Sequence, residues 1–160
     1  MEKLKVGDLE IVLREGTQED RQFVYQLMKF NLEEKFRRYL PEGWSDEKFD
    51  MGFKSDRITI LEHEGVPIGF LDLEFRGEEA WTHNLHVSRE YEGRFIGMAV
   101  LRYMERMAVE RGAKIWRAKV FKENYRWINM LVERAGAKII ADLPEEHSYI
   151  LGKDLEGTNG

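Results

Sequence analysis

The sequence predicts a mixed α/β domain in which a largely antiparallel sheet carries helices on both faces. Three observations lead to this fold class. The chain has 160 residues, a common size for one domain, and 42% of them are hydrophobic. Gly and Pro residues separate short segments. The hydrophobic period within these segments changes between that of strands and that of helices.

The first elements are a strand and two helices. Residues 9–14 alternate as a strand, and Thr17 is expected to cap the next helix in a variant capping box with Asp20. This helix extends toward Pro41, and a second short helix starts at Ser45. The apolar stripe of the first helix consists of Phe23, Val24, Leu27 and Met28.

The middle of the chain predicts three strands that are joined by short turns and therefore pair antiparallel. A helix that ends at Gly112 separates the last of these strands from the next one, so those two strands should be parallel through a right-handed crossover. The predicted order is β-α-α-β-β-β-α-β-α-β-β, with residues 1–155 as one domain and 156–160 as a flexible tail. The predicted strands of this part are 58–62, 66–75, 80–87, 114–120, 137–142 and 148–151, and its helices are 97–111 and 124–134.

Charge and composition exclude several functional classes. The net charge is −5, from 25 basic and 30 acidic residues, which makes a general nucleic-acid binder a poor candidate. The absence of cysteine excludes disulfides, thiolate metal sites and cysteine nucleophiles. No apolar run is long enough for a membrane span and the start has no signal-peptide pattern, so we expect a cytoplasmic protein. Few glutamines and abundant Glu, Lys and Arg indicate a heat-adapted source.

The most informative segment runs from a strand through a glycine-bearing loop into a helix. The strand ends at Val87, and the loop Tyr91–Gly97 leads into the helix. Free backbone N–H groups and the positive end of a helix converge at such a place, which suits a phosphate. The alternative is a β-to-α connection that binds nothing. Neither a P-loop nor a dinucleotide fingerprint is present.

This segment resembles the GNAT superfamily of acyl-CoA-dependent N-acyltransferases. The spacing from Val87 to Gly97 and from Gly97 to Gly112 fits that family without gaps. The order of elements fits along nearly the whole chain, and Asn124 and the segment 133–137 resemble the second cofactor-binding region. The resemblance implies that acetyl-CoA is the cosubstrate and that an amine is acetylated by direct attack.

The resemblance also implies the binding residues. Acetyl-CoA would lie between the strands 80–87 and 114–120, with the backbone near Leu85 or Val87 polarising the thioester carbonyl. The implied cofactor-binding residues are Leu85, His86, Val87, Gly93, Arg94, Phe95, Ile96, Gly97, Met98 and Asn124. The acceptor would be a small-molecule or protein amine, no metal, nucleic acid or membrane is expected, and the protein would be a monomer or a homodimer.

The loop departs from the family pattern at two positions. Glu92 stands where the family prefers Arg or Gln, and Phe95 stands where it usually has a glycine. Phe tolerates a positive φ poorly, and Glu92 places a negative charge near a proposed anion site. These departures favour an alternative hypothesis, a non-catalytic GNAT-fold module that binds acyl-CoA or serves in an interaction.

His83 is the candidate general base, because the family often places Glu or His on the strand before the loop. A regular strand would put it on the same face as Leu85 and Val87, with His86 on the other face. The alternative is a packed strand histidine. Three residues apart on a strand, His83 and His86 do not easily share a metal.

Two other side-chain groups have open roles. The tyrosine acid frequent in the family is absent, and Tyr125 and Tyr149 are the candidates to replace it. An aromatic cluster falls where the family builds its acceptor site, either as a pocket for an apolar substrate or as helix-packing core. Its members are Phe30, Phe36, Tyr39, Trp44, Phe49 and Phe53.

Overall fold

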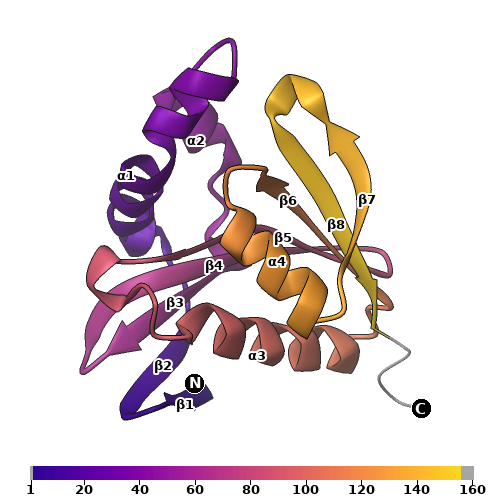
Figure 1. Cartoon of the computed structure of the whole chain (residues 1–160). Helices are drawn as coiled ribbons and strands as arrows, with labels where there is room; N and C mark the ends of the chain where they lie inside the picture. Colours follow the sequence, from indigo (N-terminus) through magenta and orange to yellow (C-terminus); the bar gives the residue numbers. More distant parts are fainter. Residues whose placement is uncertain (1, 156–160) are drawn as a thin grey trace.

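An eight-stranded sheet forms the centre of the structure, in the order β1-β2-β3-β4-β5-β6-β8-β7 (Figure 1). The computed structural model describes residues 2–155, so the tail predicted for 156–160 lies outside the described residues. Among the strand pairs described, β5 with β6 is parallel and the others are antiparallel, which confirms the predicted sheet. The strands are β1 (Glu2–Val6), β2 (Leu9–Glu15), β3 (Ile58–His63), β4 (Val66–Arg76), β5 (Glu79–Val87), β6 (Ile115–Phe121), β7 (Lys138–Leu143) and β8 (Ser148–Asp154).

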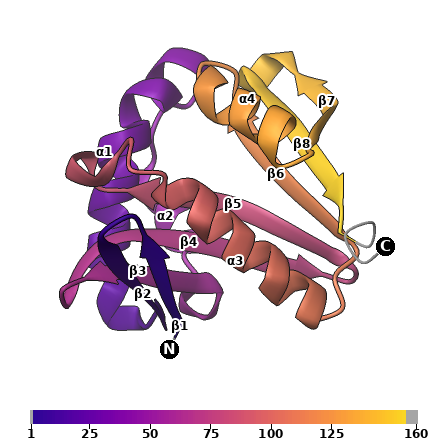
Figure 2. The ribbon, with the colours of Figure 1, turned by 60° about the horizontal axis from the view of Figure 1, so that its bottom comes forward.

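Four α-helices cover the two faces of the sheet. Helices α1 (Arg21–Tyr39) and α2 (Asp46–Gly52) pack on one face. Helices α3 (Ile96–Glu110) and α4 (Tyr125–Arg134) pack on the other, where α3 runs along the sheet (Figure 2). The predicted helices on both faces are therefore confirmed.

Each face of the sheet has its own hydrophobic core. Alternate residues of a strand point to opposite faces, so Phe70 of β4 packs under α1 and α2 while Leu71 packs under α3. The core under α1 and α2 is the smaller one. Its buried residues are Val24, Leu27, Phe49, Ile58, Ile60 and Phe70.

Strand β1 is absent from the predicted order. It pairs antiparallel with β2 through a two-residue turn at Gly7–Asp8, and Gly7 has a φ of +61°. The signal was available: Lys3 to Val6 alternates polar and apolar residues, and Gly-Asp is a common hairpin turn. The charges of this segment belong to the exposed side of an edge strand.

The capping box at Thr17 is confirmed, with one difference in the helix start. Thr17 accepts a hydrogen bond from the backbone N–H of Glu19, and Asp20 accepts one from the backbone N–H of Thr17 at 2.9 Å. The capped turn is a 3-10 helix (Gln18–Asp20) that continues into α1. Asp20 also pairs with the guanidinium of Arg14 at 2.8 Å, which joins this turn to β2.

Candidate functional site

Strands β5 and β6 pair at one end and separate at the other. Their parallel register joins residues 79–82 to residues 115–118. Beyond Thr82, β5 continues to Val87 and β6 to Phe121, and the described structure contains no further pairing between them. The two strands diverge in both ribbon views (Figures 1 and 2). Polar groups along the free edge of β5 are therefore available to a ligand.

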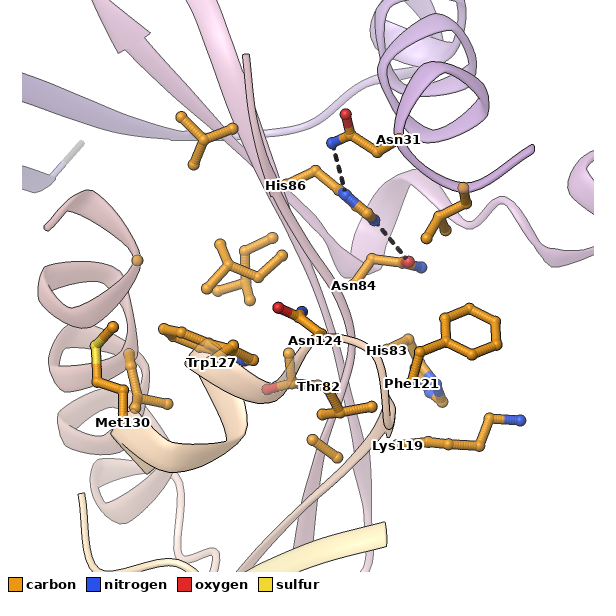
Figure 3. Close-up of a pocket in the computed structure, with 18 of the residues that line it drawn as sticks. Asn31, Thr82, His83, Asn84, His86, Lys119, Phe121, Asn124, Trp127 and Met130 are labelled. Carbon is orange, nitrogen blue, oxygen red and sulfur yellow. Dashed lines mark hydrogen bonds between the residues drawn. The ribbon is translucent and has the colours of Figure 1, made fainter. Parts of the chain in front are cut away.

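A cavity of about 690 Å³ occupies the opening, and both faces of the sheet contribute to it. From the α1 side it is lined by Asn31, Lys35 and Phe36. From the α3 and α4 side it is lined by residues that include Met98, Trp127 and Met130. Figure 3 shows Trp127 and Met130 on the opposite side of the cavity from Phe121 and Lys119 of β6. The cavity thus crosses the sheet.

The loop before α3 has two residues with a positive φ, and one of them is Phe95, a residue type that tolerates this conformation poorly. Gly93 has a φ of +77°, and Phe95, at the N-cap of α3, has a φ of +64° and a ψ of 15°. The Phe95 side chain is 71% exposed and lines the cavity. The first N–H groups of α3 have no partner within the helix, so Ile96, Gly97 and Met98 offer backbone donors at its positive end.

The other loop residues divide between packing and the cavity. Ile96 and Met98 line the cavity with largely buried, apolar side chains, so their backbone N–H groups are the polar groups they offer to a ligand. A Cβ on Gly97 would lie 3.1 Å from Cζ3 of Trp127, so this glycine permits close packing of α4 on α3. Arg94 lies over the Tyr91 ring at 5.3 Å and is not among the residues that line the cavity.

The remaining predicted binding residues line the cavity. Leu85, His86 and Val87 contribute from β5, and Asn124 contributes from the N-cap of α4. The Asn124 side chain makes no capping hydrogen bond, which leaves its amide available to a ligand. Figure 3 shows this side chain between Trp127 and β5.

His83 lies on the opposite face from the one predicted. The register of β4 and β5 shifts between Asp72 and Leu73, so that His83 is the extra residue of a bulge. Its side chain contacts Glu74, and strand alternation places Glu74 on the same face of β4 as Phe70, which packs under α1 and α2. The bulge therefore turns His83 away from the face of Leu85 and toward α1. His83 still lines the cavity.

Glu74 fixes the His83 imidazole. His83 Nε2 lies 2.8 Å from Glu74 Oε1, and this hydrogen bond holds the pKa of Glu74 below its usual value. In the neutral imidazole, an ionised Glu74 accepts from Nε2–H, so Nδ1 is the acceptor nitrogen of that tautomer. Trp81 stacks beside the ring with a centroid distance of 6.4 Å. The sequence analysis missed Glu74, because only the cross-strand register brings it to His83.

His86 lies on the opposite face from Leu85 and Val87, as predicted; it faces α1 and belongs to a polar network. Its Nδ1 lies 3.0 Å from the Asn31 amide nitrogen, and its Nε2 lies 3.1 Å from Asn84 Oδ1 (Figure 3). Asn31 donates and Asn84 accepts, so the ring is neutral with the proton on Nε2. Burial lowers the pKa of His86 to about 4, and Lys35 acts in the same direction.

The network continues to a buried carboxylate. Asp72 is buried, pairs with Arg57 Nε at 3.1 Å and also interacts with the Asn84 side chain. Burial raises the pKa of Asp72 above its usual value, against the opposing effect of Arg57. These groups fix the α1-facing side of β5 beside the cavity.

Three further expectations concern acids, metals and membranes. Neither Tyr125 nor Tyr149 is among the described residues that line the cavity; Tyr149 instead lies under Lys122 Nζ at 4.9 Å.

Within residues 2–155, no group of three or more His, Cys, Asp or Glu side chains could hold a metal ion. No helix in the same range is long and apolar enough to cross a membrane.

Several solved structures share this fold. A GNAT-family acetyltransferase from Staphylococcus aureus Mu50 superposes with a TM-score of 0.73 at 12% identity, covering 91% of this chain and 99% of its own. Ard1 from Thermoplasma volcanium superposes with a TM-score of 0.72 at 18% identity, covering 90% of this chain and 97% of its own. The PaiA N-acetyltransferase from Thermoplasma acidophilum, solved with coenzyme A, superposes with a TM-score of 0.70 at 16% identity, covering 90% of this chain and 98% of its own.

The two sequence comparisons give different results. No curated protein matches the chain significantly. The family model described as the acetyltransferase (GNAT) family matches residues 26–137, which include the divergent strands, the loop before α3 and Asn124. The chain therefore belongs to the GNAT acetyltransferase family of acyl-CoA-dependent enzymes.

Proposed function

We propose that this protein transfers an acetyl group from acetyl-CoA to a primary amine of a small molecule or protein, with His83 as the general base. The observation that carries the proposal is the cavity that crosses the sheet between β5 and β6. A donor on the α3 side and an acceptor on the α1 side can meet in this opening. Acetyl-CoA supplies an activated acyl group as a thioester.

The residues on the α3 side fit a thioester with a pyrophosphate. The loop with Gly93 and Phe95 in left-handed conformations leads to the free N–H groups of α3, which suit the pyrophosphate. The free edge at Leu85–Val87 offers backbone groups to the pantetheine amides, and a backbone N–H there would polarise the thioester carbonyl. The uncommitted amide of Asn124 faces this edge across the cavity.

The acceptor amine must lose a proton before it attacks. A lysine-like amine has a pKa of about 10.4, so deprotonation at pH 7 costs about 4.6 kcal/mol. In the neutral tautomer that Glu74 selects, His83 Nδ1 can take this proton directly or through a water. The nitrogen then forms the amide bond as the C–S bond breaks, its second proton goes to the sulfur, and His83 returns its proton to solvent.

Glu74 acts as a positioning residue for this base. It holds the imidazole tautomer, and its negative charge stabilises the imidazolium that forms. Arg57 and Arg76 both pair with Glu74, at 3.7 and 2.9 Å, and keep the carboxylate ionised. The bulge at His83 is what brings its imidazole to the face of Glu74.

Binding is tested first, by thermal denaturation with acetyl-CoA and with ATP and NADH as controls. A ligand at 100 times its Kd stabilises by about 2.7 kcal/mol, a shift of roughly 5–11 °C in a domain of this size. We expect the shift with acetyl-CoA alone. If calorimetry also detects no binding, the chain is the non-catalytic scaffold of the alternative hypothesis.

The base is tested in a transfer assay with an amine panel. His83→Ala should lower kcat by about 10²- to 10⁴-fold and leave the Kd of acetyl-CoA unchanged. Glu74→Gln should lower kcat about tenfold with little change in KM, and it should have no further effect in the His83→Ala background. Equal losses from Glu74→Gln with and without His83 would contradict the positioning role.

A further inference from the structure

A second cavity adjoins the first on the α1 side of the sheet. Its volume is about 420 Å³, and it lies beneath the segment 40–45 that connects α1 to α2. Phe36, Leu40 and Glu146 line both cavities. A concave hollow of this size that adjoins the first cavity is suited to a ligand group.

Aromatic rings form a continuous wall from the first cavity into the second. Phe121 of β6 lines the first cavity, and its ring centroid lies 5.8 Å from that of Phe36. Phe36 in turn lies 5.6 Å from Trp44, and Trp44 lies 6.5 Å from Phe49. Trp44 and Phe49 line the second cavity. Of the six aromatic residues that the sequence placed in one cluster, three therefore line this path.

The charged groups around the second cavity are already paired with each other. Glu42 pairs with Lys48, and Glu146 accepts a hydrogen bond from Lys119 Nζ at 2.7 Å. Among the described residues, the rest of the lining is largely apolar and consists of Met28, Leu40, Pro41, the aromatic side chains, Gly43 and Ser45. An apolar group gains from such a surface, whereas a charged group would have to break an existing pair.

The end of α1 and the β7–β8 hairpin contact each other beside the two cavities. Tyr39 stacks on His147 of the hairpin with centroids 4.0 Å apart, and Arg38 pairs with Glu123 at 3.2 Å. In Figure 1, α1 with its connection to α2 and the tip of the hairpin rise on the same side of the sheet. These contacts hold the end of α1 against the hairpin beside the two cavities, which are partly open to solvent.

We infer that the acceptor is a primary amine with an apolar group, aromatic or long-chain alkyl, and that this group lies in the second cavity while the amine reaches His83. The inference rests on the proposed function, because it assigns the acceptor half of the same site. Lys35 lines the first cavity and interacts electrostatically with Glu123. A second ammonium group in the second cavity would lose its hydration and would have to break one of the ion pairs there, so polyamines are disfavoured.

The first test uses the wild-type protein and a series of n-alkylamines from propylamine to octylamine, with 2-phenylethylamine, ethanolamine and putrescine added. Each methylene buried in the second cavity should raise kcat/KM about two- to fourfold until the cavity is full. We expect 2-phenylethylamine to exceed ethanolamine at least tenfold, and putrescine to be the poorest substrate. A flat series, or a preference for ethanolamine or putrescine, would overturn the inference.

The second test fills the second cavity by a substitution. Met28 lines the second cavity and not the first, so Met28→Trp should raise KM for 2-phenylethylamine at least tenfold. It should leave kcat/KM for ethanolamine and the Kd of acetyl-CoA unchanged. Met51→Trp is the matched control, because Met51 is 74% exposed on α2 and lines neither cavity.

The two tests separate failure of the inference from failure of the proposed function. If acetyl-CoA does not bind, or if no amine in the panel is acetylated, the proposed function fails. If transfer occurs but Met28→Trp lowers kcat/KM equally for apolar and polar amines, only the apolar subsite is refuted. The alkylamine series needs no variant, so it decides the inference even if Met28→Trp does not fold.

Discussion

Replacing Phe95 by glycine should stabilise the fold. A residue other than glycine in the left-handed region costs about 1–2 kcal/mol, and Phe95 has a φ of +64°. Glycine adds freedom to the unfolded chain, which offsets about 0.4–1 kcal/mol of the gain. Because the ring is 71% exposed, its removal sacrifices little apolar burial. The expected net gain is about 0.5–1 kcal/mol, or about 1–4 °C in Tm.

Two further variants isolate the cause of this gain. Phe95→Ala removes the ring but keeps a side chain at the same φ, so it should give no comparable stabilisation. Glu64→Gly relieves the same type of conformation, at a φ of +52° in the turn between β3 and β4, and should stabilise without any effect on acetyl-CoA binding. Urea denaturation monitored by tryptophan fluorescence measures all three free energies of unfolding.

Acetyl-CoA titrations of the same variants separate the ring from the backbone. We expect equal Kd values for Phe95→Gly and Phe95→Ala, because the backbone already has the conformation that glycine would adopt. A change common to both variants measures the contact of the ring with the ligand. If Phe95→Gly destabilises the protein by more than 1 kcal/mol, the strain argument is wrong and Phe95 is a stabilising residue of the loop.

Three more substitutions test the network and the packing around the site. Burial lowers the pKa of His86 from 6.5 to about 4, so between these pH values the unfolded chain binds more protons than the folded one. The free energy of unfolding should therefore fall by up to about 3 kcal/mol as the pH drops from 6.5 to 4. His86→Gln should flatten this part of the pH–stability curve, and an unchanged slope would refute the assignment. Arg57→Met leaves the buried Asp72 carboxylate without its ion-pair partner and should lower the free energy of unfolding by about 3–5 kcal/mol at pH 7.5. The loss should be smaller at pH 5 and small when Arg57→Met is combined with Asp72→Asn, both measured by urea denaturation. Gly97→Val should destabilise by about 1–3 kcal/mol, because its side chain meets Trp127, and a shift in tryptophan fluorescence should accompany the loss.

Local patterns were sufficient to predict most of the fold. The Thr17 capping box, the Ser45 cap of α2 and the glycine after α3 each depend on neighbours within a few residues. The parallel pairing of β5 with β6 followed from the helix between them. Strand β1 was not predicted, because three of its five residues are charged and its position at the sheet edge leaves most of them exposed.

The candidate site could be predicted only in part, because cross-strand register is not a local property. The sequence located the β5 edge, the loop and Asn124, but a bulge of one residue reversed the face of His83. Glu74 is nine residues from His83 along the chain and 2.8 Å from it in space, and no periodic pattern connects the two. The second cavity likewise depends on how the segment 40–45 meets the hairpin, which single-sequence patterns do not determine.

The bulge explains how one strand serves both faces of the sheet. In a regular strand, a base placed two residues before Leu85 would share its face and would lie among the groups that bind the donor. The extra residue turns His83 toward α1, while Leu85 and Val87 stay on the α3 side. In the proposed mechanism, donor binding and proton removal therefore lie on opposite faces of the sheet, at the point where β5 leaves β6. The proposed acceptor would then enter from the α1 side, which is the side where the second cavity and its aromatic wall lie.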